Sequence, residues 1–322
     1  MHPARIAKIF QIEEIMSDKL VKLLFQDKNC RAAVLRMDEA WQSMTKNQHL
    51  PTPVKTLLGK MCAGAVLLAG SLKFKGALVL QLQGDGPVKL ALVEVRTGLV
   101  VRATAQLRVK PEAIAENAAF KDLVNATGNG RCAMILDSDD RRVGEEPYQG
   151  VVALDNDGVA ATLEAYMTHS EQLKTRLWLA ADSQVCAGVM LQKMPGTGGL
   201  QTSTTPNSED EAFDSIAVLA QTVKDDELLK LEADTVAKRL FWEDNPKVLA
   251  VLTPVFRCRC SKAGIEAMIR NLGQEEAEKL IAERGTIEVT CEFCGARYIL
   301  DAVDVGALFH NGTTQSASAA KN

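Results

Sequence analysis

The stretch FRCRC at Phe256–Cys260 is followed, near the end of the chain, by TCEFCG at Thr290–Gly295. These two stretches hold four of the eight cysteines within one 37-residue window, from Cys258 to Cys294. The other four cysteines lie singly along the first two-thirds of the chain. Two close pairs spaced C-x-C and C-x-x-C are typical of a metal site, so the end of the chain is predicted to be a small metal-binding module.

The composition is that of a globular protein, with 322 residues of which 47% are hydrophobic and 24% are charged. This length predicts about two domains. A formal net charge of −4 gives no general attraction to polyanions and argues against non-specific nucleic-acid binding. The first twenty residues lack a long apolar core, and the run Met61–Gly70 is too short to cross a bilayer. We therefore expect no membrane partner and a cytoplasmic protein in a reducing compartment.

Residues 1–194 are predicted to form one N-terminal domain of the α+β class. A helix is expected over residues 52–74, and QGDGP at Gln83–Pro87 supplies the glycines and proline of a hairpin turn. Strands alternate with helices through short connections, which favours a mainly antiparallel sheet with helices. The strands are expected at residues 76–82, 88–95, 99–107, 131–137, 148–155, 175–181 and 185–192, with a helix at residues 158–173.

Residues 195–250 are predicted to be a flexible joint followed by an amphipathic helical linker. The joint, residues 195–208, is small, polar and rich in glycine, serine and threonine. Ser208 and Glu211 match a capping box that would open the linker helix. Apolar residues then recur at three- and four-residue spacing, as in a helix with one buried face. This segment is too short to form its own core, so its apolar face must pack on a neighbouring domain.

Residues 251–310 are predicted to form the C-terminal zinc-binding module, and residues 311–322 a disordered tail. Zinc prefers four soft ligands in tetrahedral arrangement, and cysteine thiolates satisfy it. Two short helices ending at Gly273 and Gly285, a hairpin around the second cysteine pair and a closing helix can bring the pairs together. The expected ligands of Zn²⁺ are Cys258, Cys260, Cys291 and Cys294, with His310 as a possible substitute.

Two interpretations of this site remain open from the residues alone. It can be a static structural zinc site, because a module of this size has little core of its own. It can also be a redox switch, because basic residues near the pairs favour thiolates and each sulfur has a neighbour that can form a disulfide with it. The nearby basic residues are Arg257, Arg259, Lys262 and Arg297.

The chain resembles the bacterial 33 kDa chaperonin family of redox-regulated holdase heat-shock proteins over nearly its whole length. The resemblance rests on the order of the cysteine pairs together with several short motifs, each weak alone. These are LKFKG (Leu72–Gly76), LQLQGDGP (Leu80–Pro87), YQGVV (Tyr148–Val152), SEQLKTRL (Ser170–Leu177) and MLQKMP (Met190–Pro195).

This resemblance implies an ATP-independent chaperone that is inactive while reduced and bound to zinc. It further implies that oxidants, with mild heat, form the disulfides Cys258–Cys260 and Cys291–Cys294, release zinc, unfold the module and then the linker, and lead to a homodimer. Unfolding client proteins would then bind. Our hypothesis is that the apolar face of the linker supplies the client contacts, through Phe213, Ile216, Leu219, Leu228, Leu229, Leu240 and Phe241.

Other functions have weaker support. A zinc-ribbon module that binds nucleic acid or protein is the main alternative, but residues 251–310 hold seven Lys and Arg against nine Asp and Glu. An oxidoreductase would place C-x-x-C at a strand-to-helix start rather than in a hairpin, so we expect no catalytic residues and no enzyme. The acidic turn containing Asp137, Asp139 and Asp140 could bind a cation, but a solvated turn is favoured. Core positions are expected for Cys30, Cys62, Cys132 and Cys186.

Overall fold

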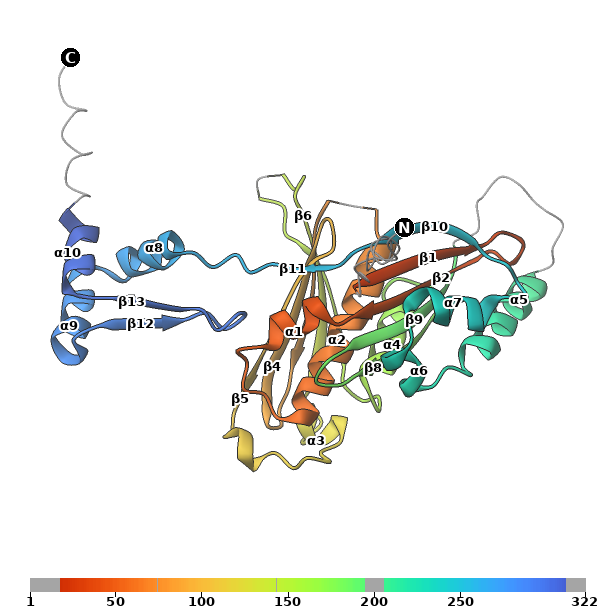
Figure 1. Ribbon diagram of the computed structural model, residues 1–322, viewed down its shortest axis with the longest axis horizontal. Coiled ribbons are helices and arrows are strands. Elements are labelled where there is room, and N and C mark those ends of the chain that lie inside the picture. Colours follow the sequence, from red (N-terminus) through yellow and green to blue (C-terminus); the bar gives the residue numbers. More distant parts are fainter. Residues whose placement is uncertain (1–17, 74, 143, 195–205, 311–322) are drawn as a thin grey trace, which may run out of the picture. The chain divides into compact units, whose positions relative to one another are not determined.

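The structure is a computed structural model that describes residues 18–310 except residues 74, 143 and 195–205, and the side chains of residues 206–209 and 310 are also outside it (Figure 1). The described residues divide into two compact units. One unit holds His49–Phe256 with the chain up to Ser43, and the other holds the chain from Arg257 with Met44–Gln48. The predicted tail and residues 195–205 of the predicted joint lie outside the described residues.

The first unit contains a five-stranded antiparallel sheet. Its strand order is β10-β1-β2-β9-β8. The strands are β1 (Lys19–Phe25), β2 (Cys30–Met37), β8 (Thr175–Ala181), β9 (Cys186–Lys193) and β10 (Lys247–Leu252). Strands β8 and β9 match the prediction. Strand β10 lies near the C-terminal end of this unit in the sequence. It forms one edge of the sheet by pairing with β1, with Leu20 opposite Leu252.

A second sheet has six strands in the order β11-β5-β4-β3-β6-β7. The strands are β3 (Gly76–Gln83), β4 (Val88–Arg96), β5 (Val100–Leu107), β6 (Arg131–Ser138), β7 (Tyr148–Ala153) and β11 (Val255–Phe256). The hairpin predicted at Gln83–Pro87 joins β3 to β4, which pair antiparallel. Among the strands of residues 18–310 that the structure describes, only the two-residue strand β11 pairs in parallel, with β5.

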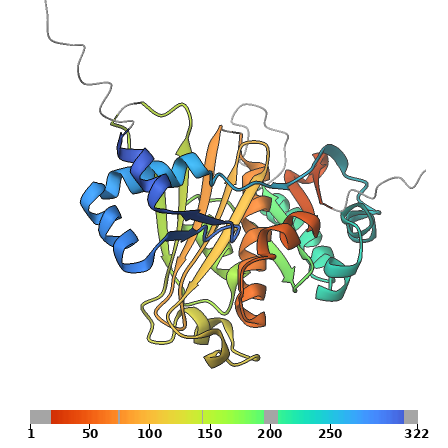
Figure 2. The ribbon, with the colours of Figure 1, turned by 60° about the vertical axis from the view of Figure 1, so that its left-hand side comes forward.

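Helix α2 (Thr52–Ser71) lies between the two sheets and contacts strands of both (Figure 2). It has the length and composition of a membrane-spanning helix, with a mean hydropathy of 1.3, but 78% of its apolar window is buried inside the protein. Glycines of α2 let the strands lie close to the helix, since Gly59 faces Ala181 of β8 and Gly70 faces Leu20 of β1. This burial is typical of a core helix, as the sequence predicts.

Short helices connect these strands. Helix α4 packs on α2, β7 and β8. The helices are η1 (Gln26–Lys28), α1 (Glu39–Thr45), η2 (Pro111–Ala113), α3 (Phe120–Val124) and α4 (Val159–His169).

The predicted linker folds as three helices that cover the other face of the five-stranded sheet, away from α2. They are α5 (Pro206–Ala220), α6 (Asp225–Lys230) and α7 (Ala233–Phe241), drawn in teal in Figures 1 and 2. Side chains of a strand alternate between faces. Val21 and Leu23 of β1 accordingly join the apolar cluster under the linker, while Leu20 contacts α2. The capping box predicted at Ser208 is wrong, because α5 begins at Pro206, a residue favoured in the first helical turn.

The second unit is a small module of helices and one hairpin. Its elements are α8 (Lys262–Leu272), α9 (Gln274–Arg284), β12 (Ile287–Thr290), β13 (Arg297–Leu300) and α10 (Ala302–His310). Gly273 and Gly285 follow α8 and α9 with φ of 97° and 78°, as expected for glycines that end helices. Val251 and Leu252 belong to β10, and Val255 and Phe256 form β11, all in the first unit; the second unit takes up the chain again at Arg257.

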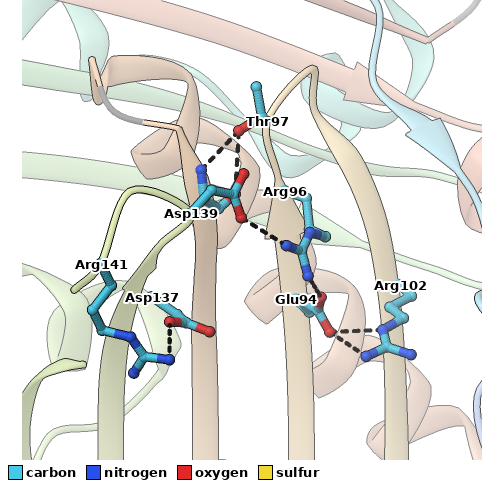
Figure 3. A network of polar contacts seen from close by, with 8 residues as sticks. Glu94, Arg96, Thr97, Arg102, Asp137, Asp139 and Arg141 are labelled. Atoms are coloured by element: carbon cyan, nitrogen blue, oxygen red, sulfur yellow. Dashed lines mark hydrogen bonds and ion pairs between the residues drawn. The ribbon is translucent and has the colours of Figure 1, made fainter. Parts of the chain in front are cut away.

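The acidic turn after β6 takes part in a network of ion pairs (Figure 3). Arg96 of β4 lies 3.0 Å from Asp139 and 3.5 Å from Glu94, whose carboxylate also accepts a bond of 2.7 Å from Nε of Arg102. Asp137 pairs with Arg141 at 3.3 Å. Two of the three aspartates therefore have an arginine partner, which favours a turn held by ion pairs over a cation site.

The predicted fold class is confirmed. The N-terminal part combines antiparallel sheets with helices, and the C-terminal part carries four cysteines close together. The structure differs from the sequence pattern in that the strands form two sheets around α2 rather than one, and in that β1 and β2 are not among the expected strands.

Candidate metal centre

Two separate segments of the module carry the cysteines. Cys258 and Cys260 lie on the extended segment between β11 and α8, where Ser261 caps α8 by accepting a bond of 3.1 Å from the backbone N–H of Gly264. Cys291 and Cys294 lie in the turn between β12 and β13, which pair antiparallel with Thr290 opposite Arg297. The cap and the hairpin thus fix the directions in which the two cysteine pairs leave the backbone.

The turn between β12 and β13 is closed by backbone hydrogen bonds. The N–H of Cys291 donates to the carbonyl of Ala296 at 2.9 Å, and the N–H of Gly295 donates to the carbonyl of Cys291 at 2.8 Å. Gly295 has φ of 68°, a conformation that glycine adopts without steric cost. The glycine of C-x-x-C-G therefore allows the tight turn that carries both sulfurs.

The four sulfur atoms lie within 4.8 Å of one another. Sγ of Cys258 is 3.6 Å from Sγ of Cys291, and Sγ of Cys260 is 3.4 Å from Sγ of Cys294. Sulfurs about 2.3 Å from one tetrahedral ion are separated by about 3.8 Å, whereas a disulfide bond is about 2.05 Å long. The cysteines are free thiols, and their donor set and spacing fit one tetrahedral metal ion. In the described part of the chain, no other group of three or more potential metal ligands is found.

The surroundings of Cys258, Cys260 and Cys294 shift the pKa values of their thiols in different directions. Burial raises the pKa of the Cys260 thiol, but hydrogen bonds from Tyr298 and from the other three cysteines outweigh burial and bring its pKa down to about 7. Burial raises the pKa of Cys258, and it raises the pKa of Cys294 to about 12. Among these three, Cys260 is therefore the strongest candidate for a thiolate at neutral pH.

The module has a small apolar core and ion pairs of its own. Six buried side chains form the core: Ile269, Ala277, Ile287, Leu300, Val305 and Leu308. Two of the basic residues near the cysteine pairs have carboxylate partners, since Lys262 lies 3.4 Å from Asp304 and Arg297 lies 3.6 Å from Glu288. His310, the possible substitute ligand, lies in α10, but its side chain is outside the described part.

The other four cysteines are buried in the first unit, as expected from their lack of local partners. Burial raises the pKa of Cys30 and of Cys132 to about 12, and it also raises the pKa of Cys186. These thiols are poor sources of thiolate. The four cysteines of the module are half-buried and therefore more accessible to solvent.

The seven apolar linker residues of the client hypothesis all face the five-stranded sheet. Five are buried in one cluster with β1, β2, β8 and β9: Phe213, Ile216, Leu228, Leu240 and Phe241. Leu219 and Leu229 are half-buried and pack against the same cluster. The proposed client contacts are thus covered by the sheet in this conformation.

Sequence reasoning missed the basic residues that meet the linker. Lys19, Lys28, Lys174 and Lys193 of the first unit each lie within 3.1 Å of a linker carboxylate. The signal in the sequence is the excess of acid in residues 209–244, which hold eleven Asp and Glu against four Lys and Arg. That excess indicates a basic partner surface without identifying its residues.

Comparison with known proteins places the chain in a family. The family model described as "Hsp33 protein" matches residues 18–301. A 33 kDa chaperonin of Methylobacillus flagellatus is 38% identical over 91% of this chain and 95% of its own length. One of Chromobacterium violaceum is 36% identical over 95% of this chain and 98% of its own length.

A solved structure supports the fold. The 33 kDa chaperonin (heat shock protein 33 homolog) of Thermotoga maritima has a TM-score of 0.72 to this chain at 21% identity, covering 92% of this chain and 99% of its own. The family match, the relatives and the four-cysteine module agree with one another. The chain belongs to the Hsp33 family.

Proposed function

We propose that this protein is a redox-regulated molecular chaperone that holds unfolding client proteins without ATP and is inactive while its four thiolates hold zinc. The observation that carries the proposal is the convergence of four sulfurs from two distant segments of a module with a small core. The ligands would be Cys258, Cys260, Cys291 and Cys294. Zinc bound there would keep the sulfurs as thiolates and tie the two segments together.

The module would depend for its stability on the metal that joins its two cysteine-bearing segments. Structural zinc sites contribute ~10–16 kcal/mol in peptide models, whereas whole domains are stable by ~5–15 kcal/mol. Within the described part of the module, the core has six buried side chains with a few partly buried apolar residues packed against them. Loss of the four thiolates is therefore expected to unfold the module, which makes the site suitable as a switch rather than only as a support.

The oxidant in the proposed switch is a peroxide. A cysteine thiolate attacks the peroxide O–O bond, takes one oxygen as sulfenic acid and releases hydroxide; the sulfur loses two electrons to the peroxide. A neighbouring thiolate then attacks this sulfur, forms the S–S bond and displaces a second hydroxide. The two hydroxides take protons from solvent, so each disulfide consumes one peroxide and yields two waters.

The choice of disulfide partners decides whether oxidation unfolds or locks the module. Disulfides Cys258–Cys260 and Cys291–Cys294, which family membership suggests, each lie within one segment and leave the two segments untied. Cross-linked pairs Cys258–Cys291 and Cys260–Cys294 would join the segments and stabilise the module by roughly 4 kcal/mol through the loop they close. Only the pairing within each segment is consistent with a switch that releases structure.

Connectivity links the module to the linker. Strand β11 is joined to Cys258 by a single residue, Arg257, and β10 lies between β11 and the linker helices. Unfolding of the module would remove the folded anchor at this end of the linker. The linker still has its own packing on the sheet, so mild heat is expected to act together with the oxidant. The exposed linker and sheet faces would then bind clients.

On the same basis we propose that the protein acts in the cytoplasm and that oxidised molecules form homodimers. The test of the function is aggregation of a chemically denatured client, followed by light scattering without ATP. The reduced, zinc-loaded protein is compared with the same protein after peroxide at mild heat. Suppression by the oxidised form alone is the expected result; equal suppression by both forms, or by neither, would contradict the proposal.

A further inference from the structure

The surface that the linker covers has an apolar centre. It is formed by side chains on one face of four strands: Val21, Leu23, Phe25, Cys30, Ala32, Val34, Ala180, Ala187, Val189 and Leu191. The apolar residues of α5, α6 and α7 complete this cluster. Once the linker is displaced, the face would be left without its apolar cover.

Positive charges surround this apolar centre. Lys19 lies 2.7 Å from Asp234, Lys28 lies 2.6 Å from Asp244, and Arg36 lies 3.8 Å from Glu232. The three cations belong to β1, η1 and β2, whereas the three carboxylates belong to the linker.

The β8 and β9 side of the sheet shows the same arrangement. Lys174 lies 2.8 Å from Asp214 and 3.6 Å from Asp210, and Lys193 lies 3.1 Å from Asp210. Lys174 also places its ammonium 4.8 Å from the centre of the Phe213 ring. These lysines hold the pKa of Asp210 below its usual value, with the hydrogen bond from Lys193 as the largest cause.

All six of these ion pairs share one polarity, with the carboxylate on the linker and the cation on or next to the strands of the five-stranded sheet that it covers. We define the cationic rim as Lys19, Lys28, Arg36, Lys174 and Lys193. The linker thus has the chemistry that this face recognises, namely an apolar helical stripe with Asp and Glu at its borders.

On the proposed function, the face uncovered by the linker takes up clients. We propose that this face selects apolar segments flanked by acidic residues, because the linker that covers it carries that same pattern. This inference rests on the proposed chaperone function and adds the class of client segment. Displacement of the linker removes these six ion pairs around an apolar centre. A client segment with acidic flanks restores both kinds of contact, whereas a segment with basic flanks is repelled.

The competition explains why the face is closed in the reduced protein. A tethered segment competes at an effective concentration in the millimolar range for short flexible tethers, so a client in solution displaces it poorly. The acidic residues of the linker add charge complementarity to this advantage. Clients therefore gain access only after the linker has lost its helical structure.

The size of the charge effect can be bounded. An exposed ion pair changes an equilibrium constant by a factor of roughly 1.4 to 5. Loss of all six pairs, at the lower end of this range, is therefore expected to weaken binding of an acidic segment on the order of tenfold. The effect should shrink as ionic strength rises, because exposed charges are screened.

The experiment measures binding of fluorescent peptides to the full-length protein after peroxide and mild heat. The first peptide has the sequence of residues 209–244. The second replaces the five rim-facing acids by amides: Asp210→Asn, Asp214→Asn, Glu232→Gln, Asp234→Asn and Asp244→Asn. A matched control replaces five other acids and has the same net charge: Glu211→Gln, Asp225→Asn, Asp226→Asn, Glu227→Gln and Glu243→Gln.

The protein is varied in parallel. The rim variant carries Lys19→Gln, Lys28→Gln, Lys174→Gln and Lys193→Gln. Its control carries four exposed lysines changed elsewhere on the first unit: Lys75→Gln, Lys89→Gln, Lys110→Gln and Lys121→Gln. Aggregation of a denatured client is followed with the same samples to read the holding activity itself.

The first peptide is expected to bind the activated protein about tenfold more tightly than the second, with the matched peptide close to the first. The rim variant, which keeps only Arg36 of the rim, should bind the first and second peptides with nearly equal affinity, and the lysine control should preserve the difference. Equal affinity of the activated protein for all three peptides, while it still holds client, would overturn the charge selection alone. Absence of holding after oxidation would overturn both this inference and the proposed function.

Discussion

The ring of Phe241, the last residue of helix α7, meets the ring of Phe25 at the end of β1 edge-on, with centroids 5.3 Å apart and planes at 83°. Edge-to-face pairs of this kind add about 0.5–1.5 kcal/mol beyond the burial of their area. Phe241 is 1% exposed, whereas the next residue, Trp242, is 71% exposed. Phe241 thus helps to anchor the linker to the sheet, whereas its neighbour Trp242 contributes little burial.

Phe241→Ala should release the linker without oxidation. Truncation of a buried phenylalanine costs about 3–5 kcal/mol, which is a large part of what holds three short helices on a sheet. We expect the reduced variant to suppress client aggregation and its α6 and α7 amides to exchange faster with deuterium. Trp242→Ala is the matched control and should behave as the wild type. A reduced Phe241→Ala protein with no holding activity would argue against linker docking as the inhibitory contact.

Cys291→Ala should remove the metal and unfold the module while the first unit stays folded. The variant leaves three thiolates, so the metal that would join the two segments is bound less tightly. The core of six buried side chains is too small to keep the module folded without the metal. Zinc content by elemental analysis and amide spectra of residues 257–310 provide the measurement. Cys132→Ala, in the core of the first unit, is expected to retain zinc. Retention of bound zinc and of a folded module in Cys291→Ala would show that these sulfurs are not essential ligands.

The disulfides of the oxidised protein should lie within each cysteine pair. Peptide mapping under non-reducing conditions is expected to find Cys258 bonded to Cys260 and Cys291 bonded to Cys294. The sulfur contacts of the reduced protein run across the two segments, at 3.6 Å and 3.4 Å, so the module must rearrange before the expected bonds form. Mapping that instead finds Cys258–Cys291 and Cys260–Cys294 would indicate a locked module and contradict the switch.

Asp18 should make the first unit less stable as pH rises. Its carboxylate accepts bonds of 2.7 Å from the N–H groups of Asp38 and Ala40, but burial raises its pKa from 3.8 to about 6. The folded state then binds more protons than the unfolded state between these values. The contribution of Asp18 to stability is therefore full below about pH 3.8 and is lost as pH rises through about 6.

Urea unfolding at several pH values between 4 and 7 tests the role of Asp18, with Asp18→Asn as the comparison. The variant accepts one fewer hydrogen bond and should be less stable overall. The difference in unfolding free energy between wild type and variant should nevertheless narrow as pH rises through the window. A difference that stays constant with pH would show that Asp18 has an ordinary pKa in the folded protein.

Local patterns account for the parts of the fold that sequence predicts well. The turn residues at Gln83–Pro87 specify the β3–β4 hairpin, and Gly273 and Gly285 end their helices because glycine adopts positive φ. The two cysteine pairs identify the candidate metal centre because their spacing is itself the chemical signal. In each case the information lies within a few residues of the feature.

Pairings between distant segments could not be predicted in this way. Strand β10 pairs with β1, and β11 pairs with β5, although nothing in the run Lys247–Phe256 distinguishes these partners from the following module. The helical period of the linker shows that it has an apolar face, but it does not show which surface covers that face. The cationic rim depends on such long-range packing, so it emerged only from the structure.

The most direct test of the account follows zinc release and client holding in the same sample. The reduced protein is treated with peroxide at mild heat, zinc is read with a metal-sensitive dye, and light scattering reports aggregation of a denatured client. The account predicts that zinc release precedes or accompanies the gain in holding, and that reductant with added zinc reverses both. Zinc that is released without any gain in holding, or holding that develops while zinc stays bound, would contradict it.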